Sequence, residues 1–254
     1  MKTGTWLVLV GGLWLTLVST GWALDEQFNC EATVAVKSKH LWRGQLINED
    51  WIFQPGISAA YGRLSGGLTA NIGLTDAHGR KYEVQRADFF AAFTESLEGI
   101  EWINYSLGIM QYDYVRERRE TTEVYGQLDF DMALSPSLAC YFESHNADGA
   151  YLSVSIARTV QSEVDMIWGS PLKLDLGAKL GWGSSNYNSK YWGVAEGQLN
   201  DFVLSAAMPL TLWGYDVVPE IAYVGIVGQK IKDSTRYSDD NTSVFFGVGI
   251  SKSF

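Results

Sequence analysis

Apolar and polar residues alternate one by one along most of the chain after residue 27. In "EVYGQLDFDM", residues 123–132, Val124 and Leu128 belong to one set of alternate positions, whereas Glu123 and Asp129 belong to the other. Successive side chains of a β-strand point to opposite faces, so this alternation predicts a strand with one apolar and one polar face. The last twelve residues alternate in the same way and end on the aromatic Phe254.

Twelve segments share this pattern, and no convincing helical period interrupts them. The predicted strands cover residues 30–43, 52–61, 64–74, 85–94, 100–112, 123–132, 138–145, 150–161, 172–182, 194–208, 216–227 and 243–254. Within 196–202 the alternation changes phase, which predicts a β-bulge. The chain is therefore expected to be all-β.

The connections between these strands alternate between long and short. Longer polar segments lie near 44–51, 75–84, 113–120, 184–192 and 228–242, with a shorter one at 146–149, and mostly tighter turns lie near 62, 96, 135 and 209. Long loops at one end and short turns at the other are typical of an up-and-down antiparallel transmembrane β-barrel of an outer membrane. The even number of about 12 strands fits this topology, with both termini at the short-turn end.

Alternation alone leaves two orientations open, because a lipid-carrier barrel places its apolar face inward and a membrane barrel places it outward. A barrel of about eight strands is already just wide enough for side chains to fill. Twelve strands would enclose a lumen too wide for apolar side chains alone. We therefore expect the apolar face to contact lipid, where a register slip would expose charges at a cost of about 2–4 kcal/mol each.

The N-terminus has the layout of a secretory signal peptide. Lys2 precedes an apolar stretch from Trp6 to Val18, and small residues follow at Gly21 and Ala23. A transmembrane anchor, the alternative, needs about 20 apolar residues. We expect a signal peptide at 1–23, cleaved after Ala23, an outer-membrane β-barrel domain at 24–254, and localisation in the cell outer membrane.

Charge and cysteine content limit the possible partners. The chain has 19 basic and 29 acidic residues, so removal of Lys2 leaves 18 against 29 and a net charge of −11. This acidity argues against nucleic acid as a partner. No motif for a cofactor, haem or metal ion is present, and Cys30 and Cys140 are expected to be two buried free thiols rather than a disulfide. The expected partners are outer-membrane lipid, lipopolysaccharide and the barrel assembly machinery; the sequence leaves the oligomeric state open.

Aromatic residues gather near both ends of the predicted strands, as expected of rings at the two membrane interfaces. The set near the long-loop end is Trp42, Trp51, Phe53, Tyr112, Tyr114, Tyr191 and Trp192, and the set near the short-turn end is Phe28, Tyr61, Phe93, Trp102, Trp213 and Tyr215.

The inward face carries the candidate functional residues. The predicted pore lining is Lys37, Lys39, Arg43, Arg86, Asp88, Glu123, Asp129, Asp131, Lys173, Asp175 and Lys179. With the further inward acids Glu31, Glu143, Asp201 and Glu220, six bases face nine acids. Two interpretations stay open: structural ion pairs that fill the interior, or charges that select the permeating ion.

Three motifs carry a family resemblance. They are "SKHLWRG" at 38–44, "FQPGISAAYGRLSGGLTANIGL" at 53–74 and "GVGISKSF" at 247–254. Together they resemble the TorF-type porin (Gcw_chp) family of Gram-negative outer-membrane β-barrels. This resemblance implies a barrel and a pore but no particular solute. Lys39, where an acidic residue is common, and Lys252, within the lipid-facing set, depart from the pattern.

The expected function is a non-enzymatic porin for passive diffusion of small polar solutes or ions, with a weak preference for cations. Phe254 matches the terminal signal read by barrel assembly machinery. One alternative is a structural or adhesive barrel without an open pore. A lipid-modifying enzyme is a further alternative that rests on Ser144 and His145, but neighbours on one strand point to opposite faces and cannot easily share a proton.

Overall fold

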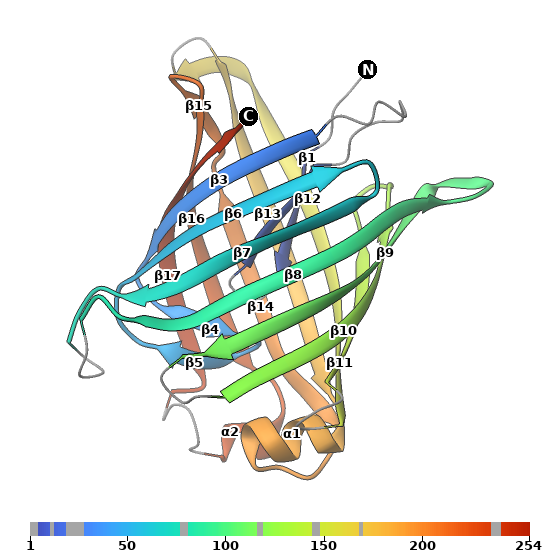
Figure 1. Cartoon of the computed structure of the whole chain (residues 1–254), viewed down its shortest axis with the longest axis vertical. Coiled ribbons are helices and arrows are strands. Elements are labelled where there is room, and N and C mark those ends of the chain that lie inside the picture. The colour runs from blue at the N-terminus through green and yellow to red at the C-terminus, as the bar shows by residue number, and fades with distance from the viewer. Residues whose placement is uncertain are drawn as a thin grey trace.

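The computed structural model describes residues 5–10, 13–18, 28–76, 81–115, 119–143, 148–167, 170–234 and 240–254. Among these, twelve antiparallel strands form a closed barrel (Figure 1). In order around the barrel they are β3 (Phe28–Lys37), β6 (Ile52–Tyr61), β7 (Leu64–Gly73), β8 (Val84–Leu97), β9 (Ile100–Tyr114), β10 (Arg119–Phe130), β11 (Ser137–Glu143), β12 (Gly149–Ile167), β13 (Ser170–Gly183), β14 (Gln198–Ala207), β16 (Tyr215–Ile226) and β17 (Thr242–Ser253). Each of the twelve predicted strands has its counterpart.

The barrel closes where the last strand pairs with the first. Strand β17 pairs with β3 in antiparallel register, and the Phe254 N–H donates a hydrogen bond to the Cys30 carbonyl at 2.9 Å. A short strand, β15 (Leu210–Leu212), pairs with β16 at the turn that precedes it. Closure leaves no strand edge unpaired, which is a requirement for sheets within a membrane.

The apolar positions lie on the outer face, as the alternation predicts. Val124, Leu128 and Phe246 are 57%, 38% and 51% exposed, whereas Glu123 and Asp201 on the inner face are 1% and 0% exposed. The predicted bulge is also present. Between the pairs Leu180–Phe202 and Trp182–Leu199, the register of β13 and β14 shifts by one residue.

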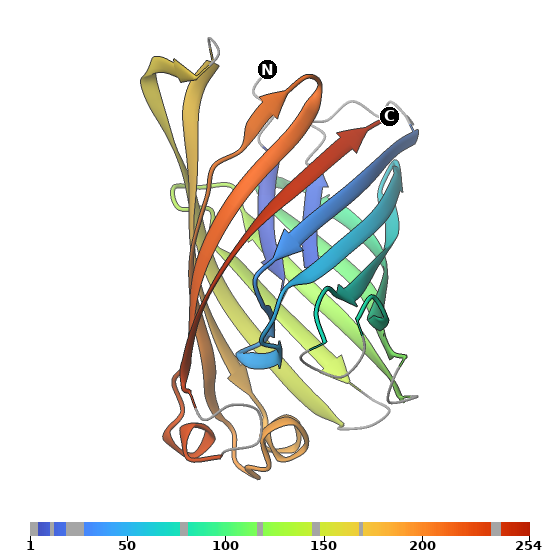
Figure 2. The same ribbon diagram turned by 90° about the vertical axis from the view of Figure 1, so that its left-hand side faces the viewer.

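The two ends of the barrel differ (Figures 1 and 2). Helices α1 (Ser185–Trp192) and α2 (Gln229–Lys232) lie at one end, and the C-terminus and the β15–β16 turn lie at the other. Neither helix among the described residues is long and apolar enough to cross a membrane. The long connections therefore share the helical end, and the short turns share the end with the C-terminus.

The first predicted strand, 30–43, is too long. Strand β3 ends at Lys37, and the chain then forms a separate hairpin from β4 (His40–Trp42) and β5 (Gln45–Asn48). Its turn residues Arg43 and Gly44 have φ values of 49° and 82°, the backbone signs of a two-residue type I′ turn. This luminal hairpin, residues 40–48, lies within the ring of strands instead of forming an outer loop (Figure 1).

The segment predicted as a polar loop at 184–192 is mostly the helix α1. The Ser184 side chain accepts a hydrogen bond from the Tyr187 N–H at its start, and Gly193 ends it in a left-handed conformation. These are the usual capping residues of a short helix. The helix buries Tyr187, Tyr191 and Trp192 against the barrel.

Residues 5–18 contain a small separate sheet of β1 (Thr5–Val10) and β2 (Leu13–Val18). Both views show this hairpin inside the ring of barrel strands (Figures 1 and 2). It pairs only with itself. The predicted cleavage after Ala23 lies outside the described residues, and if it occurs the mature barrel lacks this hairpin.

The two cysteines are free, and the prediction that both are buried is wrong. Cys30 on β3 is half-buried and Cys140 on β11 is exposed. Cys140 alternates with Leu138 and Phe142, both exposed on the outer face, so lipid rather than protein surrounds its thiol. Ser144 and His145, on which the enzyme alternative rests, lie outside the described residues.

Candidate functional site: the charged lumen

Arg43, at the tip of the luminal hairpin, reaches across the lumen to the opposite wall. Its Nη1 donates a hydrogen bond of 2.7 Å to Oε1 of Glu123 on β10, and its Nη2 donates one of 2.7 Å to Oε2. The side chains of Arg43 and Glu123 are 2% and 1% exposed. A planar guanidinium that meets a carboxylate through two parallel bonds is the most specific ion-pair geometry available to proteins.

Four aromatic rings surround the same guanidinium. The Cζ atom of Arg43 lies 4.6 Å from the ring centroid of Trp42, 4.4 Å from that of Tyr141, 4.5 Å from that of Tyr151 and 5.8 Å from that of Tyr187. All four distances lie within the range of a cation–π contact. We call these four rings, together with Glu123, the guanidinium cage.

The hairpin tip also contacts the wall next to the cage. A side chain on Gly44 would place its Cβ 2.8 Å from Asp201 Cβ and 2.8 Å from Ile226 Cδ1. The positive φ of Gly44 and this close approach both require glycine. The hairpin tip therefore packs against β14 and β16, while Arg43 reaches β10.

The bulge in β14 supplies Asp201 to this contact. Both Asn200 and Asp201 are fully buried, so two successive side chains face the lumen where regular alternation would allow one. The Tyr151 hydroxyl donates a 2.8 Å hydrogen bond to Asp201 Oδ1. The bulge thus adds a carboxylate beside the guanidinium cage, as bulges near functional sites often do.

Several other inward charges also form pairs. Lys37 lies 3.1 Å from Glu220, Arg86 lies 2.6 Å from Asp88, and Lys179 lies 3.9 Å from Asp201. At the helical end, Glu143 pairs with Lys190 of α1 and accepts a 2.6 Å hydrogen bond from Tyr191. We call these pairs, together with Arg43 and Glu123, the ion-pair network of the lumen.

His40, on the luminal hairpin, is 1% exposed, and neither of its ring nitrogens has a hydrogen-bond partner among the residues that the structure describes. Burial lowers the pKa of His40 well below its usual value, and the nearby cations Arg86 and Lys37 lower it further. The imidazole is therefore neutral at pH 7.

The structure brings together most, but not all, of the predicted pore-lining residues. Lys37, Arg43, Arg86, Asp88, Glu123 and Lys179 belong to the ion-pair network described above. Lys39 lies half-buried between β3 and β4, and Lys173 is exposed on β13.

Three predicted acids lie away from that network. Asp129 and Asp175 are half-buried and accept hydrogen bonds from Gln127 and Thr159. The placement of Asp131 on the inner strand face is wrong, because β10 ends at Phe130 and Asp131 is exposed in the turn that follows.

The predicted aromatic belts are confirmed at one end only. Near the short turns, Phe28, Tyr61, Trp102, Trp213 and Tyr215 are exposed, and the ammonium of Lys252 lies 4.8 Å from the Tyr215 ring. Near the long loops Trp51 is 40% exposed, but Trp42, Tyr112, Tyr114, Tyr191 and Trp192 are all buried inside. Those five rings pack the lumen instead of the lipid interface.

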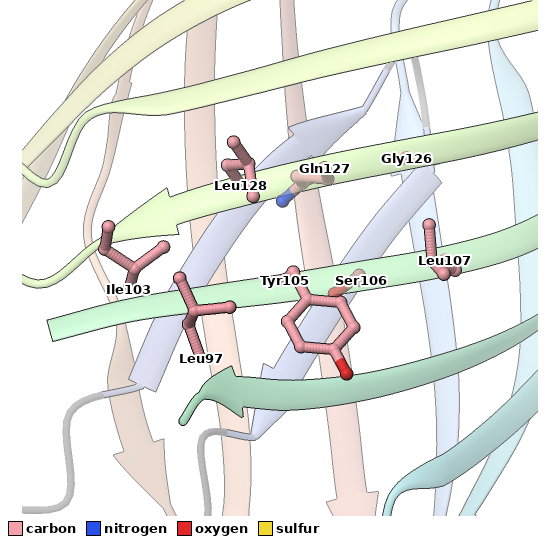
Figure 3. Close-up of a pocket in the computed structure, with 8 residues that line it drawn as sticks. All are labelled: Leu97, Ile103, Tyr105, Ser106, Leu107, Gly126, Gln127 and Leu128. Carbon is pink, nitrogen blue, oxygen red and sulfur yellow. The ribbon is translucent and has the colours of Figure 1, made fainter. Parts of the chain in front are cut away.

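A depression of about 370 Å³ lies on the wall formed by β9 and β10 (Figure 3). Leu97, Leu107 and Leu128 line it with exposed side chains. Its apolar lining and its place on the outer face fit contact with a lipid chain. Among the described residues, no three His, Cys, Asp or Glu side chains are grouped so as to hold a metal ion.

No protein-family model and no curated protein sequence matches this chain. Solved structures that match include one titled "KdgM porin", with a TM-score of 0.48, 10% identity and coverage of 89% of this chain and 99% of that one. The COG4313 outer membrane channel from Pseudomonas putida F1 matches with a TM-score of 0.40 and 11% identity over 89% of this chain and 94% of the channel. Membership of the TorF-type family stays a prediction.

A closed sheet with an apolar outer face and a charged interior is the architecture with which β-proteins span an outer membrane. This chain has both properties, from the pairing of β17 with β3 to the exposed apolar positions of all twelve strands. It is an outer-membrane β-barrel whose lumen is crossed by an inward-folded hairpin.

Proposed function

We propose that this protein is an outer-membrane channel for passive diffusion of small polar solutes or ions, with the luminal hairpin at its narrowest point. The observation that carries the proposal is the contrast between the two faces of one sheet. The outer face is apolar, whereas the inner face carries Lys37, Asp88, Glu123, Lys179 and Asp201. Charged side chains at close quarters act on the ions that pass them.

The luminal charges support a weak preference for cations. Most inward charges cancel in pairs, but Asp129 and Asp175 have no basic partner among the described residues. Lys173 is the exposed base on the same wall. These two carboxylates near the permeation path favour cations modestly.

Recordings from planar bilayers that contain the purified protein test the proposal. Discrete conductance steps support a channel. The double variant Asp129→Asn with Asp175→Asn should move the reversal potential under a salt gradient toward that of anions, while heat-modifiability on gels reports an intact barrel. An unchanged reversal potential would assign both carboxylates a structural role.

A second candidate is a structural barrel without an open pore. It is favoured by the dense packing around the luminal hairpin, where Trp42, Arg43, Tyr151 and Tyr187 are each 3% exposed or less. Silence in the bilayer recordings would support this candidate, and turnover of lipid in the same preparation would support an enzyme instead.

A further inference from the structure

We propose that the guanidinium cage is the solute site of this channel, that Arg43 occupies it as a tethered ligand, and that the preferred solutes carry a guanidinium group. This inference rests on the proposed channel function and names the class of solute. Its basis is that the Arg43 guanidinium makes contacts in the lumen that the guanidinium of a free solute could also make.

Most of the cage does not belong to the hairpin that carries Arg43. Tyr141 comes from β11, Tyr151 from β12, Tyr187 from α1 and Glu123 from β10. Only Trp42 lies on the hairpin itself. If the hairpin shifts, three rings and the carboxylate remain in place and present an empty site for a cation.

The rest of the wall holds these groups in position. The Tyr151 hydroxyl donates to Asp201, and Tyr187 lies on a capped helix whose backbone packs directly against Gly149. Tyr125 stacks on Tyr141 with centroids 5.6 Å apart. A cage supported by a second layer of contacts is preorganised for its ligand.

Movement of Arg43 out of the cage would break no hydrogen bond of the barrel ladder. The luminal hairpin forms its own two-stranded sheet and shares no ladder with the twelve barrel strands. Arg86 offers a contrast, because it also lies within 6 Å of aromatic rings but is part of β8 and pairs with Asp88 on the same strand. In the part of the chain that the structure describes, only the Arg43 guanidinium is both caged and carried by a separate element.

The chemistry of the cage favours a guanidinium over other cations. Glu123 accepts two parallel N–H bonds, which a planar fork of donors satisfies and a compact ammonium does not. A quaternary ammonium could contact Tyr141 and Tyr151 but has no N–H to donate. A neutral urea group has the planar shape but lacks the charge that both the rings and Glu123 attract.

Uptake of labelled solutes into proteoliposomes, at concentrations well below saturation, tests the inference. The probes are arginine, its near-isosteric neutral analogue citrulline, and lysine, which has the same charge without the planar fork. We expect arginine to enter about thirtyfold faster than citrulline, the ratio to which one desolvated cation–π contact of about 2 kcal/mol corresponds. Lysine should enter more slowly than arginine.

Variants of one ring provide matched controls. Tyr141→Leu removes a cage ring and should lower the arginine-to-citrulline ratio several-fold, whereas Tyr141→Phe keeps an aromatic face and should retain the preference. Tyr223→Leu removes a ring that is exposed on the outer face of β16 and should leave the ratio unchanged. As a second measurement, Arg43→Ala should bind guanidinium ion, and Arg43→Ala with Tyr141→Leu should bind it at least several-fold more weakly.

The outcomes separate this inference from the channel function on which it rests. If salt conductance is measurable but arginine, lysine and citrulline enter at equal rates, the channel stands and the guanidinium site is refuted. Equal entry of arginine and lysine, both faster than citrulline, would reduce the preference to charge alone and also refute it. Absence of conductance and of uptake in both the wild type and Arg43→Ala would overturn the channel, and this inference with it.

Discussion

A substitution that removes either charge of the Arg43–Glu123 pair should be among the most destabilising single changes in the lumen. The pair is joined by two 2.7 Å bonds and is almost fully buried. Removing one partner of such a pair leaves an uncompensated charge and typically costs about 3–5 kcal/mol. We therefore expect Arg43→Met and Glu123→Gln each to lower the free energy of unfolding by about 3 kcal/mol.

The double variant should lose much less than the sum of the two single variants. Methionine fills most of the volume of the Arg43 stem, and glutamine keeps an acceptor for the Tyr112 hydroxyl, which lies 3.2 Å from Glu123. With both charges gone, no unpaired ion remains in the lumen. The expected coupling energy between the two positions is about 2–3 kcal/mol.

Urea unfolding of the barrel refolded in lipid vesicles measures these energies. Tryptophan fluorescence is a suitable signal, because Trp42 lies 4.6 Å from the Arg43 guanidinium. The control is the pair of Arg63 and Glu95, 2.8 Å apart, in which Arg63 is 49% exposed; exposed pairs couple by about 0.2–1 kcal/mol. If the coupling energy between Arg43 and Glu123 is no larger than that of this control, the luminal pair does not stabilise the barrel as its geometry indicates.

Three further predictions concern topology, assembly and pH. A cysteine at Leu128 should resist a water-soluble thiol reagent in intact membranes while one at Glu49 reacts, and the opposite result would refute the assignment of the outer face. Deletion of Phe254 should lower the yield of heat-modifiable barrel in cells, and an unchanged yield would count against an assembly signal. The folded state keeps His40 neutral, whereas the unfolded chain binds a proton at this residue below about pH 6.5. The free energy of unfolding should therefore fall as the pH drops below that value, by at most about 1.4 kcal/mol per pH unit. His40→Leu should make the free energy of unfolding in urea less dependent on pH between about pH 5 and 6.5, and an equally steep dependence would show that other groups cause it.

The strand register could be predicted because one face of every strand must meet lipid. A slip by one residue would turn Glu123 and Asp129 outward, and this penalty makes the alternation a reliable guide. Even the bulge at Asn200 and Asp201 is visible in the sequence as a change of phase. The outer surface is thus specified locally, residue by residue.

The contents of the lumen could not be predicted in the same way. Alternation continues through 38–43 although β3 ends at Lys37, because the hairpin also buries alternate residues such as His40 and Trp42. Arginine is a rare residue at positive φ, so Arg43 gives no turn signal. Buried rings such as Tyr112 look the same in sequence as rings at a membrane interface, since both positions suit an amphipathic side chain.

A signal for α1 was present in the sequence. Ser184 and Gly193 stand at the distances expected of an N-cap and a C-terminal glycine, and Tyr187 and Tyr191 are four residues apart, on one face of a helix. The polar composition of 184–192 concealed them. A helix of eight residues spans only about two turns, so its hydrophobic period is weak.

The separateness of the luminal hairpin has a consequence for engineering and for evolutionary change. Lys37 and Ile52 are direct register partners on β3 and β6, so the residues between them could be exchanged for a two-residue turn without altering the shear of the cylinder. The width of the lumen would then depend on one insertion, the hairpin between β3 and β6. Evolution, or a designer of sensing nanopores, could change the selectivity of such a barrel and leave its lipid-facing strands unaltered.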